Sequence, residues 1–127
     1  MTDFATPDAG TTPLIDTFAL ATAATAELED WGPLAEATGE PMHAYGTEFW
    51  TSADGNQSAG VWECTAGPSY WVQEESEFIH VLSGTLTVTP DGGSPRTLGP
   101  GDCAMFPVGW RGAWELHSTV RKVYVIF

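Results

Sequence analysis

The sequence predicts an all-β domain, an antiparallel sandwich or barrel. From about Tyr45 onward, short runs rich in β-branched and aromatic residues follow one another, and no helical pattern separates them. Turn-forming residues stand between the runs, as in 53–56, 91–93 and 99–102. A chain of 127 residues that is 43% hydrophobic is long enough for one core and too short for two comfortable domains.

Nine strands are expected in this region. In chain order they cover residues 47–52, 60–66, 69–73, 77–83, 84–90, 94–99, 103–107, 112–117 and 121–127. Short strands that are joined by tight turns pair as antiparallel neighbours, so their apolar faces can close over a single core.

The residues before the strands predict an N-terminal arm, 1–44, that packs on the domain formed by 45–127. Residues 1–16 are rich in Thr, Pro, Asp and Gly, which is typical of a loose segment. Residues 17–29 contain several helix formers and allow one short helix. Trp31-Gly32-Pro33 then interrupts any regular element.

Charge and targeting signals limit the partners. Four basic residues against 17 acidic ones give a formal charge of -13, which repels nucleic acid and anionic membrane surfaces. The first residues lack the basic start and apolar run of a signal peptide, so a cytoplasmic location is expected. Cys64 and Cys103 have no paired-motif spacing, which predicts two reduced, buried thiols.

Two sequence blocks carry a resemblance to a known family. Gly84 follows Glu77 by seven positions in GVWECTAGPSYWVQEESEFIHVLSG, and Pro107-Val108-Gly109 follows Gly101 in GPGDCAMFPVGWRGAWELHSTVRKVYVIF. This layout resembles the cupin superfamily, and more closely its small, single-domain, ureidoglycine aminohydrolase-like members. The resemblance implies a jelly-roll barrel, often a homodimer, with a small-molecule pocket inside one end.

The resemblance also implies where a cupin places its metal ligands. The first two histidines would fall at Tyr70 and Val72, or at Trp71 and Gln73 with a shorter spacing, and the third would fall at Gly112. Only Glu77 of the four ligands is present. Because a divalent site needs about three or four converging protein ligands, we predict neither a tightly bound metal nor another cofactor.

The remaining histidines do not replace these ligands if the strands are placed correctly. Side chains three positions apart on a strand point to opposite faces, so His80 is expected outside if Glu77 is inside. The inward set 112, 114, 116 likewise places His117 outside, with Arg111 and Glu115.

Aromatic side chains gather around the two blocks. They are either core residues or walls of a pocket. The residues expected to bind substrate are Trp71, Val72, Phe106, Trp110, Gly112 and Trp114, with Gly112 leaving the room of a missing histidine ring. An inward carboxylate with aromatic walls suits an amine, a ureido or guanidino group, or a polar planar molecule.

Glu77 itself allows two interpretations. Burial in an apolar barrel suits a carboxyl group to general acid or base chemistry, with Tyr70 as a second catalytic group. Alternatively, Glu77 has a structural role: it accepts hydrogen bonds from a Tyr or Trp, or it pairs with one of the four basic residues, Arg96, Arg111, Arg121 and Lys122.

Three functions therefore stay open. The first is a metal-independent hydrolase or isomerase that acts on a small polar nitrogen-containing metabolite. The second is a non-catalytic cupin that binds a ligand or serves as a dimer scaffold. The third is a metal-dependent ureidoglycine aminohydrolase-like enzyme with unusual ligands.

Overall fold

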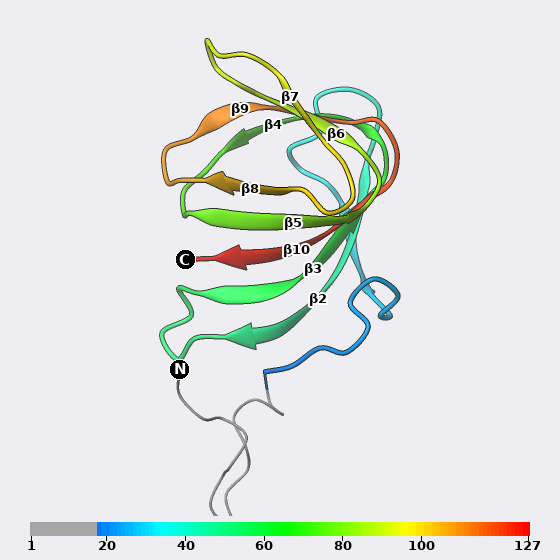
Figure 1. The fold of residues 1–127 in the computed structure, drawn as a ribbon, viewed down its shortest axis with the longest axis vertical. Coiled ribbons are helices and arrows are strands. Elements are labelled where there is room, and N and C mark those ends of the chain that lie inside the picture. The colour runs from blue at the N-terminus through cyan, green and yellow to red at the C-terminus, as the bar shows by residue number, and fades with distance from the viewer. Residues whose placement is uncertain (1–17) are drawn as a thin grey trace, which may run out of the picture.

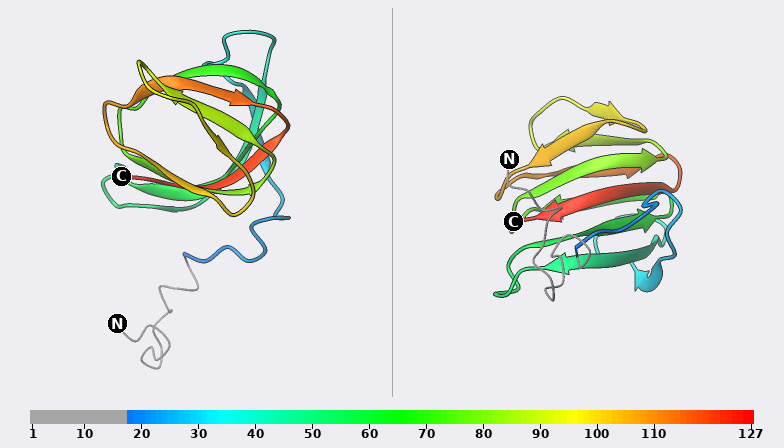
Figure 2. Two further views of the ribbon diagram at one scale, coloured as in Figure 1. Left: turned by 45° about the horizontal axis from the view of Figure 1, so that its top comes forward. Right: turned by 60° about the horizontal axis from the view of Figure 1, so that its bottom comes forward.

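Two antiparallel β-sheets face each other in the computed structural model, which describes residues 18–127 (Figure 1). The larger sheet has six strands in the order β1-β2-β3-β10-β5-β8, and the smaller has four in the order β4-β9-β6-β7. Figure 2 shows both sheets curving around a common interior. The all-β prediction is confirmed, and the architecture is a jelly roll.

The strands follow the chain from the N-terminal side of the domain to its last residues. They are β1 (Glu29–Pro33), β2 (His43–Thr51), β3 (Ser58–Cys64), β4 (Gly67–Val72), β5 (Glu77–Ser83), β6 (Leu86–Pro90), β7 (Arg96–Leu98), β8 (Cys103–Phe106), β9 (Arg111–Leu116) and β10 (Val120–Ile126). Each of the nine predicted strands has a counterpart among β2 to β10.

The structure corrects the prediction for the segment before the barrel. Trp31-Gly32-Pro33 belongs to strand β1, which pairs with β2. The register shifts between Asp30 and Gly32, and Gly32 has a φ of 81°, so a bulge accommodates the residues that suggested a break. The predicted arm, 1–44, thus contributes a strand to the larger sheet in its described part, whereas residues 1–17 lie outside the described residues.

The short helix allowed for residues 17–29 is absent from the described part of that range. Residues 21–25 form turns, in which Thr22 has a positive φ of 52° and accepts a backbone hydrogen bond from Thr25. The segment packs on the barrel, because Arg121 Nη1 donates to the carbonyl oxygens of Ala23 and Ala26. Residues 18–127 contain no helix long and apolar enough to cross a membrane.

Strand alternation decides which side chains form the core. On β9 the buried positions alternate with exposed ones and include Gly112, Trp114 and Leu116, as predicted. On β8, Cys103 is exposed and pairs with His80 on the outer face. The expectation of two buried thiols is therefore right for Cys64 and wrong for Cys103, because Cys103 occupies an outward position of its strand.

Candidate functional site in the barrel interior

Glu77 begins strand β5 with its side chain inside the barrel, where the residue is 6% exposed. Lys122, from β10, donates a hydrogen bond through Nζ to Glu77 Oε2 at 2.7 Å. Gln73 Nε2 donates to the other oxygen, Oε1, over a longer distance of 3.4 Å. Of the two interpretations of Glu77, the structure shows the ion pair and selects Lys122 as the partner.

The Lys122 ammonium is also enclosed by aromatic rings. Its Nζ lies 4.5 Å from the ring centroids of both Trp62 and Trp114. The quadrupole of an indole face attracts a cation, and more strongly where water is excluded. A carboxylate and two indoles thus compensate a charge that would be costly to bury alone.

Local strand geometry brings these groups together. Lys122 is paired across the sheet with Trp62 on β3 and with Val81 on β5, so all three side chains face the interior. Gln73 follows β4, where its backbone N–H donates to the Trp110 carbonyl and its carbonyl accepts from Gly109 N–H, both at 2.8 Å. The turn after β8 therefore fixes the position of Gln73.

A cavity of about 390 Å³ opens beside the ion pair, and we call it the Glu77 cavity. Its lining residues are Trp31, Glu36, Trp62, Trp71, Val72, Gln73, Glu74, Glu75, Glu77, Lys122, Tyr124 and Ile126. The volume falls in the range of small-molecule pockets. The ring of Trp31 lies against Gly46, whose missing Cβ would stand 2.4 Å from that ring.

One wall of the cavity is held by hydrogen bonds, and another is a buried phenol. Trp71 Nε1 donates to Ser69 Oγ at 2.8 Å, and Ser69 Oγ donates to the Trp114 carbonyl at 3.0 Å, which fixes the Trp71 ring. Burial raises the pKa of Tyr124 to about 12, with further increases from the Glu48 and Glu77 carboxylates. The Tyr124 phenol is therefore neutral at physiological pH.

Tyr70 is not brought to Glu77. It is 39% exposed, lies outside the lining of the Glu77 cavity, and donates through its hydroxyl to Asp91 Oδ2 at 2.5 Å. That hydrogen bond is the main reason why the pKa of Tyr70 is raised. Strand alternation gives the inward places to Ser69 and Trp71 and turns Tyr70 outward, so the expected pairing of Tyr70 with Glu77 is wrong in geometry.

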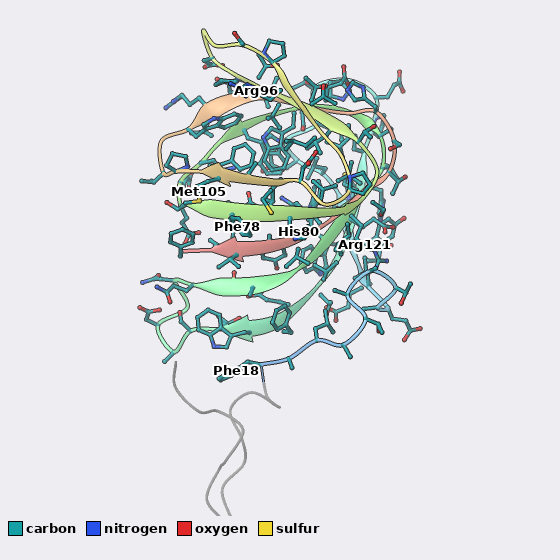
Figure 3. All side chains as sticks on the ribbon, viewed as in Figure 1. Phe18, Phe78, His80, Arg96, Met105 and Arg121 are labelled. Atoms are coloured by element: carbon teal, nitrogen blue, oxygen red, sulfur yellow. The ribbon has the colours of Figure 1, made fainter. Side chains whose placement is uncertain are left out.

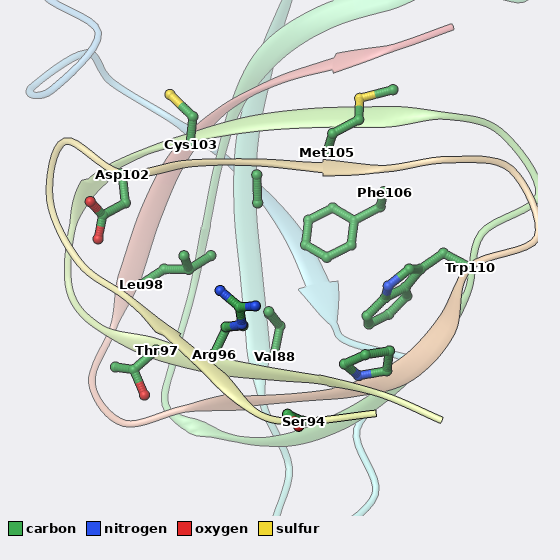
Figure 4. Close-up of a pocket in the computed structure, with 12 residues that line it drawn as sticks. Val88, Ser94, Arg96, Thr97, Leu98, Asp102, Cys103, Met105, Phe106 and Trp110 are labelled. Carbon is green, nitrogen blue, oxygen red and sulfur yellow. The ribbon is translucent and has the colours of Figure 1, made fainter. Parts of the chain in front are cut away.

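The six residues expected to bind substrate fall into three groups. Trp71 and Val72 line the Glu77 cavity, although Val72 is 45% exposed. Phe106 and Trp110 line a different cavity, shown in Figure 4.

Gly112 and Trp114 line neither cavity. A Cβ on Gly112 would stand 2.3 Å from the Thr89 carbonyl oxygen and 2.6 Å from the Trp110 ring, so the room expected for a histidine is already filled. Trp114 is fully buried in the core, and its Nε1 has no hydrogen-bond partner among the described residues.

The donor set does not fit the divalent metal that cupins commonly hold. Trp71 and Gln73 take the inward places on and after β4, and the Glu77 carboxylate is bonded to the Lys122 ammonium. Among residues 18–127, no group of three or more His, Cys, Asp or Glu side chains is arranged to bind a metal ion. His80 and His117 face outward as predicted, and His117 Nε2 contacts Thr87 Oγ1 at 2.7 Å.

Lys122 and Tyr124 are two of the cavity residues that the sequence interpretation did not assign to a binding site, as are Trp62 and Gln73. Lys122 was only one of four possible partners for Glu77. The alternation of β10 indicates that Lys122 and Tyr124 point inward, because positions 120, 122 and 124 are buried together while 121, 123 and 125 are not. A lysine between two apolar inward neighbours indicates an internal ion pair.

Comparisons with known proteins agree with this architecture. Residues 51–124, more than half of the chain, match the family described as EutQ-like cupin domain. A putative ethanolamine utilization protein Q from Salmonella typhimurium is 25% identical with a TM-score of 0.62, over 76% of each chain. No curated protein matches.

Two further solved structures belong to the DUF861 family. The Pseudomonas syringae pv. tomato protein of unknown function has a TM-score of 0.75 at 19% identity, over 82% of this chain and 46% of its own. This chain thus spans less than half of that protein. The Thermotoga maritima protein is 31% identical with a TM-score of 0.51, over 53% of this chain and 76% of its own. The finer likeness to ureidoglycine aminohydrolases stays a prediction, whereas the match over residues 51–124 shows that this chain belongs to the EutQ-like cupin domain family.

Proposed function

We propose that the Glu77 cavity binds a small amine or another cationic, nitrogen-containing metabolite without a metal ion. The observation that carries the proposal is the charge of the lining. Four carboxylates, from Glu36, Glu74, Glu75 and Glu77, stand against the single ammonium of Lys122. The indoles of the lining add ring faces that attract a cation.

Within this cavity, Glu77 is the anchor for the ligand. Its Oε2 is bonded to Lys122, but its Oε1 has only the long hydrogen bond from Gln73. Oε1 therefore keeps the capacity to accept a hydrogen bond from a ligand N–H. Lys122 is held between the Trp62 and Trp114 rings, and its ammonium balances the negative charge of the Glu77 carboxylate when no ligand is bound.

The first ligand to test is ethanolamine, because the similar Salmonella typhimurium protein is a putative ethanolamine utilization protein. Isothermal titration of the purified chain should show saturable binding. Ethylene glycol, which replaces the amine with a hydroxyl, should bind at least about tenfold more weakly, as expected for the loss of a charge-assisted hydrogen bond. Equal affinity for both molecules would contradict the proposal.

Variants of the rim separate recognition from folding. Glu74→Gln with Glu75→Gln should weaken amine binding by about three- to tenfold, because exposed charges contribute modest energies. Glu115→Gln, exposed on β9 and outside the cavity, is the matched control and should bind as the parent does. Metal analysis of the untagged protein comes first: stoichiometric Mn, Fe, Ni or Zn would overturn the metal-independent proposal.

Catalysis at the same cavity is the second candidate. The contact between Glu77 and Lys122 places a carboxylate and an ammonium at hydrogen-bonding distance, and the neutral phenol of Tyr124 lines the same space. Such a pair can take up and return a proton in a metal-independent hydrolysis or isomerisation. If the protein is an enzyme, Glu77→Gln should abolish turnover even when the ligand is saturating, in addition to weakening ligand binding. If it is a binding module, no turnover is measured with the parent.

A second copy of the chain is the partner that the outer face of the larger sheet supports. Phe78 pairs with Met105 and Val125 on that face, and His80 pairs with Cys103 and Val123. Figure 3 shows Phe78, His80 and Met105 on neighbouring strands. These positions carry no carboxylate, although the chain has 17, so two copies of the face meet without like-charge repulsion.

The oligomeric state tests this interface. Sedimentation of the parent should give a dimer, and Phe78→Glu should give a monomer. Val108→Glu, in an exposed turn after β8, changes the charge equally and should stay dimeric. A monomeric parent, or equal disruption by both variants, would contradict the interface.

A further inference from the structure

A second cavity, of about 730 Å³, lies between the free edges of the two sheets, and we call it the Arg96 cavity. Strand β8 ends the order of the larger sheet and β7 ends that of the smaller, and no ladder joins them. The lining is Val88, Pro90, Ser94, Arg96, Thr97, Leu98, Asp102, Cys103, Ala104, Met105, Phe106 and Trp110. None of these residues lines the Glu77 cavity.

The floor of this cavity is apolar and aromatic. The ring centroids of Phe106 and Trp110 lie 4.9 Å apart at an interplanar angle of 79°. The Phe106 ring also packs against the ring of the buried Trp114, with centroids 4.9 Å apart and planes tilted by 43°, so aromatic rings separate the Arg96 cavity from the barrel core. Val88 and Leu98 add aliphatic surface (Figure 4). Such a floor favours a ligand with a flat or apolar body.

Arg96 supplies the only basic group of this lining. Figure 4 shows its side chain directed into the cavity, whereas Cys103 and Met105 point away. Arg121 and Lys122 are each bonded to a glutamate, but Arg96 has no salt bridge or side-chain hydrogen bond within residues 18–127. The one acid of the lining, Asp102, instead accepts from Gly99 N–H through Oδ2 at 2.8 Å.

We infer that the Arg96 cavity is a second ligand site, for a small carboxylate attached to an apolar or aromatic body. The planar guanidinium matches a carboxylate with two parallel N–H donors. The apolar part of the ligand covers Phe106, Trp110 and Val88. This site is independent of the amine site, because the two cavities share no lining residue, and the Arg96 cavity offers a guanidinium with no salt bridge to the described residues where the Glu77 cavity offers an excess of carboxylates.

The test uses the full chain, labelled with ¹⁵N, and benzoate as the probe in an NMR titration. Benzoate should shift the amide signals of residues 96–98 and 104–106 saturably and leave those of Glu36, Lys122 and Tyr124, which line the Glu77 cavity, in place. Benzamide and acetate should each bind at least about tenfold more weakly than benzoate. Benzamide lacks the charged carboxylate that pairs with Arg96, and acetate lacks the ring that covers the aromatic floor.

A pair of arginine variants completes the test. Arg96→Gln should weaken benzoate binding about tenfold or more. Arg111→Gln is the matched control, since Arg111 is exposed on β9 and lines neither cavity, and it should bind within about twofold of the parent.

Three results would overturn the assignment: unchanged binding by Arg96→Gln, inorganic phosphate binding as tightly as benzoate, or shifts confined to the Glu77 cavity. Failure of ethanolamine binding leaves this test unaffected, and failure here leaves the amine site unaffected, because the amide signals that report on each cavity are different.

Discussion

The ammonium of Lys122 and the carboxylate of Glu77 form a 2.7 Å hydrogen-bonded ion pair inside the barrel, although 45 positions separate them in the chain. Their side chains are only 4% and 8% exposed. Removing one partner leaves an uncompensated buried charge, whereas removing both leaves none. The pair is therefore expected to behave as one unit in stability measurements.

Lys122→Met and Glu77→Gln should each lower the free energy of unfolding by about 3–5 kcal/mol, because each leaves the other group unpaired. The double variant should lose clearly less than the sum of the two single losses. Urea unfolding of all four proteins gives the coupling energy. Additive losses would show that the pair contributes little as a unit. Arg121→Met, at the partly exposed Arg121–Glu63 pair, should show a smaller coupling with Glu63→Gln.

The pKa of Tyr124 predicts a loss of stability at alkaline pH. The folded value of about 12 is above the ordinary value near 10, so the folded state keeps its proton longer than the unfolded state. The stabilisation is complete below about pH 10 and is lost as the pH rises towards 12, by roughly 2 to 3 kcal/mol in total.

Tyr124→Phe is the control for this decline. Burial also raises the pKa of Cys64 to about 11, which adds a decline of the same sign in both proteins. The contribution of Tyr124 is the difference between the two proteins in how far the free energy of unfolding falls between about pH 10 and 12. The free energy of unfolding, measured at a series of pH values, should therefore fall more steeply with pH in the parent than in Tyr124→Phe. Equal slopes would contradict the raised pKa of Tyr124.

The two thiols should differ in reactivity. Cys103 is exposed on β8 of the single chain, on the face proposed for the dimer, so iodoacetamide at about pH 8 should modify it in the monomeric Phe78→Glu variant. Cys64 is fully buried and its pKa is raised by desolvation, so it should react only when the protein unfolds. Mass spectrometry should count one modification in native Phe78→Glu, none when Cys103→Ser is added to it, and two in denatured Phe78→Glu. Two modifications in native Phe78→Glu would contradict the burial of Cys64.

Strand positions and inward faces could be predicted from the sequence because alternation and turn residues are local signals. Alternation correctly placed Trp114 and Leu116 inside and His80 and His117 outside. The register of β4 could not be predicted, since Tyr70 and Trp71 are both aromatic and either fits an inward place. The structure gives that place to Trp71, which Ser69 holds by a hydrogen bond.

The division of the aromatic residues between two cavities could not be predicted from the sequence either. It depends on the separation of β7 from β8, and sheet edges are set by tertiary packing rather than by composition. Gly112 illustrates the same limit. A glycine at an inward position suggests open space, yet the Thr89 carbonyl and the Trp110 ring already occupy it.

Gly60 makes room for the Tyr124 side chain beside the Glu77 cavity, so a larger residue at position 60 is expected to destabilise the protein. A Cβ at position 60 would stand 2.4 Å from the Thr47 carbonyl oxygen and 2.6 Å from the Tyr124 hydroxyl oxygen. The first neighbour is backbone within the β2–β3 ladder and cannot move cheaply. Gly60→Ala should therefore destabilise the protein by about 1–3 kcal/mol, as overpacking typically does.

Gly99→Ala provides the matched control. Its nearest atom, Thr85 Cγ2, is 3.8 Å from the added Cβ, an ordinary contact, so its effect should stay within about 0.5 kcal/mol. Urea unfolding compares the two variants directly. Because Tyr124 lines the Glu77 cavity, Gly60→Ala should also weaken amine binding, whereas Gly99→Ala should not. Equal stability of the two variants would show that Thr47 and Tyr124 yield to the new methyl group without cost, and would remove Gly60 from the residues that shape the cavity.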